Sequence, residues 1–147
     1  MKKIVYWATL GCLCAGMASC ASPRKTSSIA DLEGEWTVVK VGEQAIEATE
    51  EQPAPFIGFN VAEKRIYGNA GCNRILGQLN TESDSLALDK LGTTMMMCPN
   101  METETAVLKA FGQSKTFLRE GDALTFFDAD GQAVVSLTKK EEADQSK

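Results

Sequence analysis

Soft, sulfur-containing side chains gather in one short stretch of the sequence, Thr93–Glu104 (TTMMMCPNMETE). It holds four of the six methionines and one of the five cysteines. Thioether and thiolate sulfur suit Cu(I), so a soft-metal site is one interpretation of this composition. A membrane-facing patch is a second interpretation. Core packing beside a disulfide is a third, since methionine is flexible enough to fill irregular gaps.

The spacing of these methionines limits how many could reach one ion. Met95, Met96 and Met97 are consecutive, and in a strand Met96 would point away from the other two. At most two of them, with Met101, could converge, and the sequence contains no histidine to complete a site. We therefore predict no metal site and no cofactor. We expect Met96 to pack in the core beside Cys98, with Met95 or Met97 partly exposed.

No set of catalytic residues can be assembled from the sequence. The absence of histidine excludes His-based triads, His-ligated zinc and the commonest general base. Serine and threonine lack a base at motif spacing, and the segment GNAGCN lacks the lysine of a phosphate-binding loop. Glu82, Asp84 and Asp89 surround a turn, where solvated charge is the simpler interpretation. We predict a protein that is not an enzyme.

The N-terminus predicts export and lipidation. Residues 1–3 include two lysines, residues 4–17 are apolar, and small residues follow up to Cys20. This layout is typical of a secretory signal peptide and is too short for a permanent membrane span. Its end resembles a bacterial lipobox, which makes residues 1–19 the signal peptide and Cys20 the lipidated first residue. An ordinary signal peptide with a coincidental cysteine is the alternative.

Lipid on Cys20 would anchor the protein stably, because two or three acyl chains hold far more firmly than one. Residues 20–30 contain the lipidated cysteine and a polar, flexible tether. Ala21 stands where inner-membrane lipoproteins usually carry aspartate. We therefore predict a lipid anchor in the outer membrane, with the domain on its periplasmic face.

Removal of the signal peptide would make the chain more acidic. Lys2 and Lys3 leave, so Lys+Arg falls from 15 to 13 while Asp+Glu stays at 20, and the net charge changes from −5 to −7. This charge disfavours nucleic acid, which needs a basic face, and suits a basic partner. Cys72 and Cys98 would be the only unlipidated cysteines left, and in an oxidising compartment we expect them to form a disulfide.

Downstream of the tether, short apolar pieces alternate with turn residues, which predicts one mainly antiparallel β domain over residues 31–139. Within it, residues 115–139 contain three such pieces separated by Gly121-Asp122 and Asp130-Gly131, which predicts a three-stranded meander. Residues 140–147 form a charged tail of disordered character. No repeat or second domain is indicated.

One segment has helical periodicity. Asn100 can cap a helix over about 101–112, and Gly112 can end it. Glu104 lies in the middle of the apolar face of that helix. Because an unpaired buried carboxylate is unfavourable, we predict that Glu104 is a structural anchor. It would pair with Arg74, or accept hydrogen bonds from Asn73 or nearby backbone N–H groups.

Three motifs in this domain resemble those of the META domain family, whose bacterial members include the HslJ-like lipoproteins. They are Gly71-Cys72-Asn73 with Gly77, then Thr94, Met96 and Cys98, then a helix carrying Glu104. The resemblance covers about residues 32–139. Met95 departs from the family pattern, in which this position is often charged. The resemblance implies a small lipocalin-topology β-barrel or a strongly curved sheet, packed against one helix.

A function is also implied by this resemblance, since HslJ-like relatives are associated with heat response and antibiotic tolerance. We predict a monomeric, lipid-anchored module for stress protection or envelope maintenance, which binds an envelope protein or a small apolar ligand. The opening Gly34-x-Trp36 resembles that of the lipocalins, which carry apolar ligands. Inhibition of a basic exported hydrolase such as lysozyme is the alternative, by analogy with other small acidic β lipoproteins.

Overall fold

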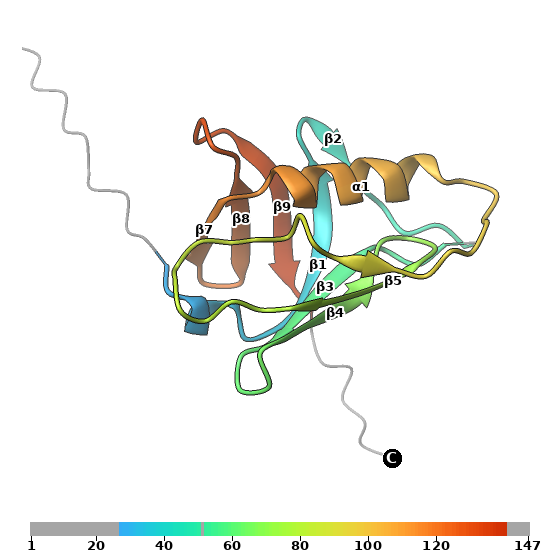
Figure 1. The fold of residues 1–147 in the computed structure, drawn as a ribbon. Coiled ribbons are helices and arrows are strands. Elements are labelled where there is room, and N and C mark those ends of the chain that lie inside the picture. The colour runs from blue at the N-terminus through green and yellow to red at the C-terminus, as the bar shows by residue number, and fades with distance from the viewer. Residues whose placement is uncertain (1–26, 51, 141–147) are drawn as a thin grey trace, which may run out of the picture.

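A computed structural model describes residues 27–50 and 52–140. The predicted signal peptide, the predicted lipidation site Cys20 and residues 141–147 of the predicted tail lie outside the described residues. Within them, nine antiparallel strands form one sheet, and one α-helix lies across a face of that sheet (Figure 1).

The elements follow one another in a simple order. A short 3-10 helix, η1 (Ile29–Leu32), precedes the first strand, and the helix α1 (Glu102–Gln113) separates the sixth strand from the seventh. The strands are β1 (Gly34–Val41), β2 (Gln44–Ala45), β3 (Phe56–Asn60), β4 (Arg65–Asn69), β5 (Arg74–Gln78), β6 (Gly92–Thr93), β7 (Thr116–Glu120), β8 (Ala123–Phe127) and β9 (Ala133–Lys139).

The sheet is open and curved. Its strand order is β6-β5-β4-β3-β1-β9-β8-β7, with β2 paired to the end of β1. β6 and β7 are therefore the two edges and are not paired with each other, so the curved sheet, not the closed barrel, is the form that the protein adopts. The predicted meander is confirmed, since β7, β8 and β9 pair in sequence. β6 is only two residues long.

Large aromatic side chains fill the space between the sheet and α1. Trp36 is fully buried, and its indole N–H donates to the carbonyl of Leu32 at 2.7 Å. Phe126 lies between Phe59 and Phe111, with ring centroids 6.4 and 6.1 Å apart, respectively. Because each of these rings is at most 1% exposed, the concave side of the sheet is a packed core.

The predicted helix is confirmed with its ends shifted by one residue. It spans Glu102–Gln113, and the Asn100 side chain accepts a hydrogen bond from the N–H of Glu102 at 3.1 Å. Asn100 therefore bonds the start of the helix, although Met101 occupies the N-cap position. Gly112 lies inside the last turn, and the hydroxyl of Ser114 donates to the carbonyl of Ala110.

The folded domain begins earlier than predicted. Ser27 and Ile29, which the sequence assigned to the tether, are 7% and 5% exposed. The hydroxyl of Ser27 accepts a hydrogen bond from the N–H of Arg119, and Ile29 joins the core. Residues 27–30 are therefore part of the folded domain and not of the predicted tether. Neither of the helices described here is long and apolar enough to span a membrane.

Candidate functional site

A disulfide joins the turn after β4 to the segment before α1. Cys72 and Cys98 are bonded, with their Cα atoms 6.0 Å apart and a separation of 26 positions in sequence. The predicted pairing is confirmed. The bond fixes the turn at Gly71–Asn73 beside the chain that follows β6 and precedes α1.

Glu104 is the buried acceptor at the centre of this arrangement. It is 5% exposed, and its Oε2 accepts hydrogen bonds from the N–H groups of Cys72 at 3.1 Å and Asn73 at 2.6 Å. Its Oε1 accepts a third hydrogen bond from the side-chain amide of Asn73 at 2.7 Å. Gly71 has φ +123°, a conformation that glycine tolerates, and this turn directs the two successive N–H groups at one oxygen.

Arg74 is not a partner of Glu104. Its side chain is exposed, its backbone N–H donates to the hydroxyl of Thr94 at 3.0 Å, and no ion pair joins it to Glu104 among the described residues. The predicted pairing with Arg74 is therefore wrong. Asn73 lies in the turn before β5 and is buried against Glu104, whereas Arg74, the first residue of β5, is exposed.

Asn73 connects Glu104 to the chain before the disulfide. Its side-chain NH2 donates to Glu104 and to the carbonyl of Met96 at 3.0 Å. Its Oδ1 accepts from the N–H of Met96 at 2.6 Å and from the hydroxyl of Thr94 at 2.8 Å. All four hydrogen-bonding positions of the amide are thus filled, and Asn73 is only 2% exposed. This set of four bonds is called the asparagine clamp below.

Residues 92–97, called the methionine segment below, are all exposed. Met95, Met96 and Met97 are 96%, 61% and 90% exposed. The expectation that Met96 packs in the core is therefore wrong, and the physical reason is the clamp. The interior contact of Met96 is made by its peptide group, which leaves its side chain outside. Within the described part of the chain, no three His, Cys, Asp or Glu side chains lie close enough to hold one metal ion.

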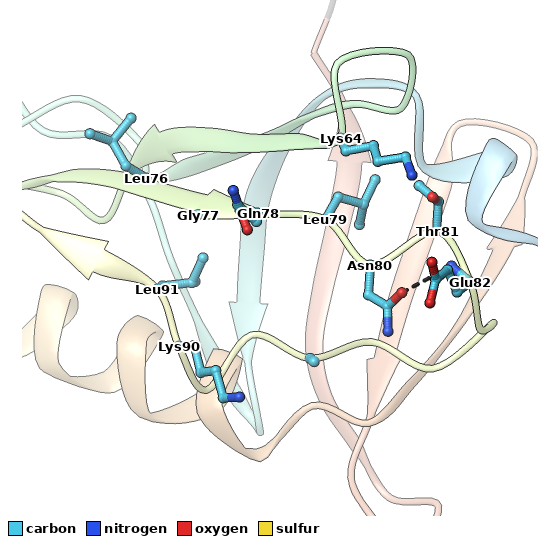
Figure 2. Close-up of a pocket in the computed structure, with 11 residues that line it drawn as sticks. Lys64, Leu76, Gly77, Gln78, Leu79, Asn80, Thr81, Glu82, Lys90 and Leu91 are labelled. Carbon is cyan, nitrogen blue, oxygen red and sulfur yellow. Dashed lines mark hydrogen bonds between the residues drawn. The ribbon is translucent and has the colours of Figure 1, made fainter.

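A groove of about 770 Å³ lies between β5 and the connection that leads to β6. Nothing in the sequence had singled it out. Figure 2 shows Lys64 and Lys90 on different sides of the groove, with leucine side chains between them. Neither lysine forms an ion pair with any described residue. The lining residues are Lys64, Leu76, Gly77, Gln78, Leu79, Asn80, Thr81, Glu82, Ala87, Lys90 and Leu91.

These features define a small β protein in which a disulfide and a buried glutamate fasten one helix to an open sheet. The family model described as the META domain matches residues 29–141, which is most of the chain. The protein belongs to the META domain family.

Two solved structures have a similar fold, both determined by NMR. A protein from Burkholderia xenovorans is 16% identical, with a TM-score of 0.61, and the match covers 97% of this chain and 100% of that one. A second protein is 21% identical, with a TM-score of 0.56, and the match covers 73% of this chain and 89% of that one. At these identities the likeness concerns the fold alone. No curated protein matches the sequence.

Proposed function

We propose that this protein is a lipid-anchored, non-enzymatic binding module of the cell envelope, which docks another envelope protein through the methionine segment. One observation carries the proposal. The backbone of the segment is fixed by the asparagine clamp and the disulfide, while the side chains of Met95, Met96 and Met97 project into solvent. Such docking would serve envelope maintenance or stress protection.

Physical chemistry explains why this arrangement favours binding. Three adjacent apolar side chains exposed to water are unfavourable for a free protein, and exposed apolar patches often mark interaction sites. Methionine is enriched in protein interfaces, because its flexible thioether adapts to the surface of a partner. A fixed backbone lowers the entropy that is lost on binding. Partner binding would therefore compensate for the exposure.

The lack of enzymatic activity is supported by the state of the acidic residue in the core. Among the described residues, Glu104 is the only buried carboxylate, and its two oxygens are already occupied by three hydrogen bonds. The sequence also contains no histidine, the commonest general base for activating a nucleophile.

The orientation of the domain suits an anchored protein that reaches a partner away from its own membrane. The blue start of the described chain lies at one end of the domain, and the gold segment that leads into α1 lies at the other (Figure 1). A lipid anchor on Cys20 would attach to the first of these ends. The methionine segment would then face away from the anchor.

Site-specific photo-crosslinking tests the proposal. A photoreactive amino acid at Met95 in the full-length protein should crosslink one defined envelope protein in intact cells, whereas the same group at exposed Asp130 should not. Replacement of the three methionines of the segment by glutamine should reduce co-purification of that protein at least tenfold. Equal crosslinking from both positions would refute docking through the segment. Retention of a basic hydrolase only at low salt would instead support the inhibitor alternative.

Carriage of a small ligand is a second candidate, which the groove favours. The core is filled by aromatic rings, so a ligand would bind in the groove between Lys64 and Lys90 and not inside the sheet. Two lysines that lack ion pairs and an apolar lining fit an amphiphile with an anionic head. Mass spectrometry of the purified protein should then detect such a molecule. It should be absent when both lysines are replaced by glutamine.

A further inference from the structure

The methionine segment is also an unpaired edge of the sheet. On its inner side, the N–H of Thr94 donates to the carbonyl of Arg74 at 3.2 Å, and the clamp bonds the peptide group of Met96. Successive residues of a strand direct their N–H and C=O groups to opposite sides. Those of Thr93 and Met95 therefore point outward. No described residue makes a hydrogen bond with the N–H or the C=O of Met95.

Asn73 extends this edge beyond β6. The strand itself has only two residues, and its ladder to β5 ends near Thr94. At Met96, the side-chain amide of Asn73 donates to the carbonyl and accepts from the N–H, as the backbone of a neighbouring strand would do. The chain from Gly92 to Met96 is thus held along β5 on its inner side, and its outer side remains open.

The opposite edge of the sheet is protected in ways that the methionine segment is not. Edge strands are commonly protected by charged side chains, by proline or by a covering loop. β7 carries Arg119 and Glu120, and the N–H of Arg119 donates to the Ser27 hydroxyl at 2.8 Å. Residues 92–97 contain no charged residue and no proline, and each of them is exposed. This difference marks the β6 edge as available for pairing.

We infer that this edge binds an extended peptide segment of the partner protein as an additional strand of the sheet. The outward peptide groups of Thr93 and Met95 would bond the backbone of the added strand, and the methionine side chains would contact its apolar residues. The peptide should lack proline and carry apolar residues at alternate positions. This inference rests on the proposed function, because it specifies how the partner docks.

A second copy of the chain fits this edge less well. Six residues extend over about 20 Å, and a contact of that length, about 10 Å wide, buries on the order of 400 Å² in total. A stable dimer needs roughly 1,200 Å² or more. Short peptides bind sheet edges through contacts of this limited size, and their backbone hydrogen bonds supply much of the affinity.

The test selects heptapeptides displayed on phage for binding to the protein. The protein is used in the form that its host produces after processing, purified in detergent. Selected peptides should lack proline and alternate apolar with other residues. The best peptide should then be synthesised in two N-methylated versions, each with methyl groups on one of the two sets of alternate amides. One of these two versions should bind at least tenfold more weakly than the unmethylated peptide. Met95→Pro, which removes an outward N–H, should weaken binding of the unmethylated peptide at least tenfold more than Met95→Gln, which keeps it.

Three outcomes would each overturn the inference. They are selection of no binder, equal binding of the unmethylated peptide and both methylated versions, and equal effects of the two Met95 variants on binding. The N-methyl comparison uses the unaltered protein, so it stands even if Met95→Pro does not fold. If the cellular partner still crosslinks at Met95 when N-methylation has no effect, strand addition is wrong and the proposed function survives. If the crosslink is also missing, both are wrong.

Discussion

Removal of the Glu104 carboxylate should destabilise the protein more than any other single change to a charged side chain of the described domain. In Glu104→Ala, three donors lose their acceptor: the N–H of Cys72, the N–H of Asn73 and the side-chain amide of Asn73. Asn73 is 2% exposed, so water cannot reach its two donors without distortion. The N–H of Cys72 is only partly buried and can be hydrated.

The magnitude follows from these donors. Each buried, unsatisfied donor costs about 1–3 kcal/mol, so the two donors of Asn73 together give about 2–6 kcal/mol for Glu104→Ala. Glu104→Gln keeps one oxygen for the two backbone N–H groups but places an NH2 group against that of Asn73. Asn73 cannot rotate to relieve this conflict, because its oxygen already accepts two hydrogen bonds. We expect about 2–3 kcal/mol for Glu104→Gln, a large share of the 5–15 kcal/mol typical of a domain.

Urea unfolding measures this loss, with the fluorescence of buried Trp36 as the reporter. Glu102→Gln is the matched control, because Glu102 lies in the same helical turn but is exposed. It removes the same charge near the helix N-terminus and should cost no more than about 1 kcal/mol. If Glu104→Gln and Glu104→Ala unfold at the same midpoint as Glu102→Gln, the carboxylate does not hold the helix to the sheet, and this reasoning fails.

Three further predictions concern the frame around this site. Gly68→Ala should lower the free energy of unfolding by about 2–3 kcal/mol, because the added methyl group would overlap the backbone of β3; Gly112→Ala, which meets no atom within 4 Å, should not lower it in the same urea titration. Burial, followed by the negative charge of Glu35, raises the pKa of Tyr67 above 10.0. The unfolded state therefore releases this proton first, so stability should fall above about pH 10 and fall less in Tyr67→Phe; parallel slopes would contradict this. Reduction of the disulfide should cost about 3.5 kcal/mol in the loop-closure estimate, and an unchanged urea midpoint in reductant would show that it contributes nothing.

The parts of the fold that were predictable from the sequence are those set by local patterns. The helix was placed within one residue, because its apolar periodicity and Asn100 lie within a single segment. The meander of β7 to β9 was also predictable, since its turns contain Gly121-Asp122 and Asp130-Gly131. The closure of the sheet was not predictable. It depends on whether β6 reaches β7, and no local pattern specifies that contact, although only α1 and its connections separate the two strands in the chain.

For the candidate site, residue types predicted that Glu104 is buried, but they did not single out which residue is its hydrogen-bond partner. A carboxylate on an apolar helical face implied that Glu104 needs hydrogen-bond donors, and Asn73 and backbone N–H groups were among the expected ones. The choice between Asn73 and Arg74 depends on which side chain of two neighbours faces the helix. That orientation is set by the turn at Gly71–Asn73, where Gly71 has φ +123°, and the sequence alone does not specify the conformation of this turn.

The error at Met96 has the same origin and explains why this surface exists. Apolar side chains usually direct a segment inward, and Met96 was expected to do so. Asn73 outweighs that preference, because burying its amide without partners would cost several kcal/mol, whereas exposing one methionine side chain costs about 1.5–3 kcal/mol. The buried amide takes the peptide group of Met96 as its partner and thereby turns the methionine side chains outward. A polar residue in the core thus sets which apolar residues the protein presents on its surface. Variants of Asn73 should therefore change binding at the methionine segment as well as stability, although Asn73 itself is only 2% exposed.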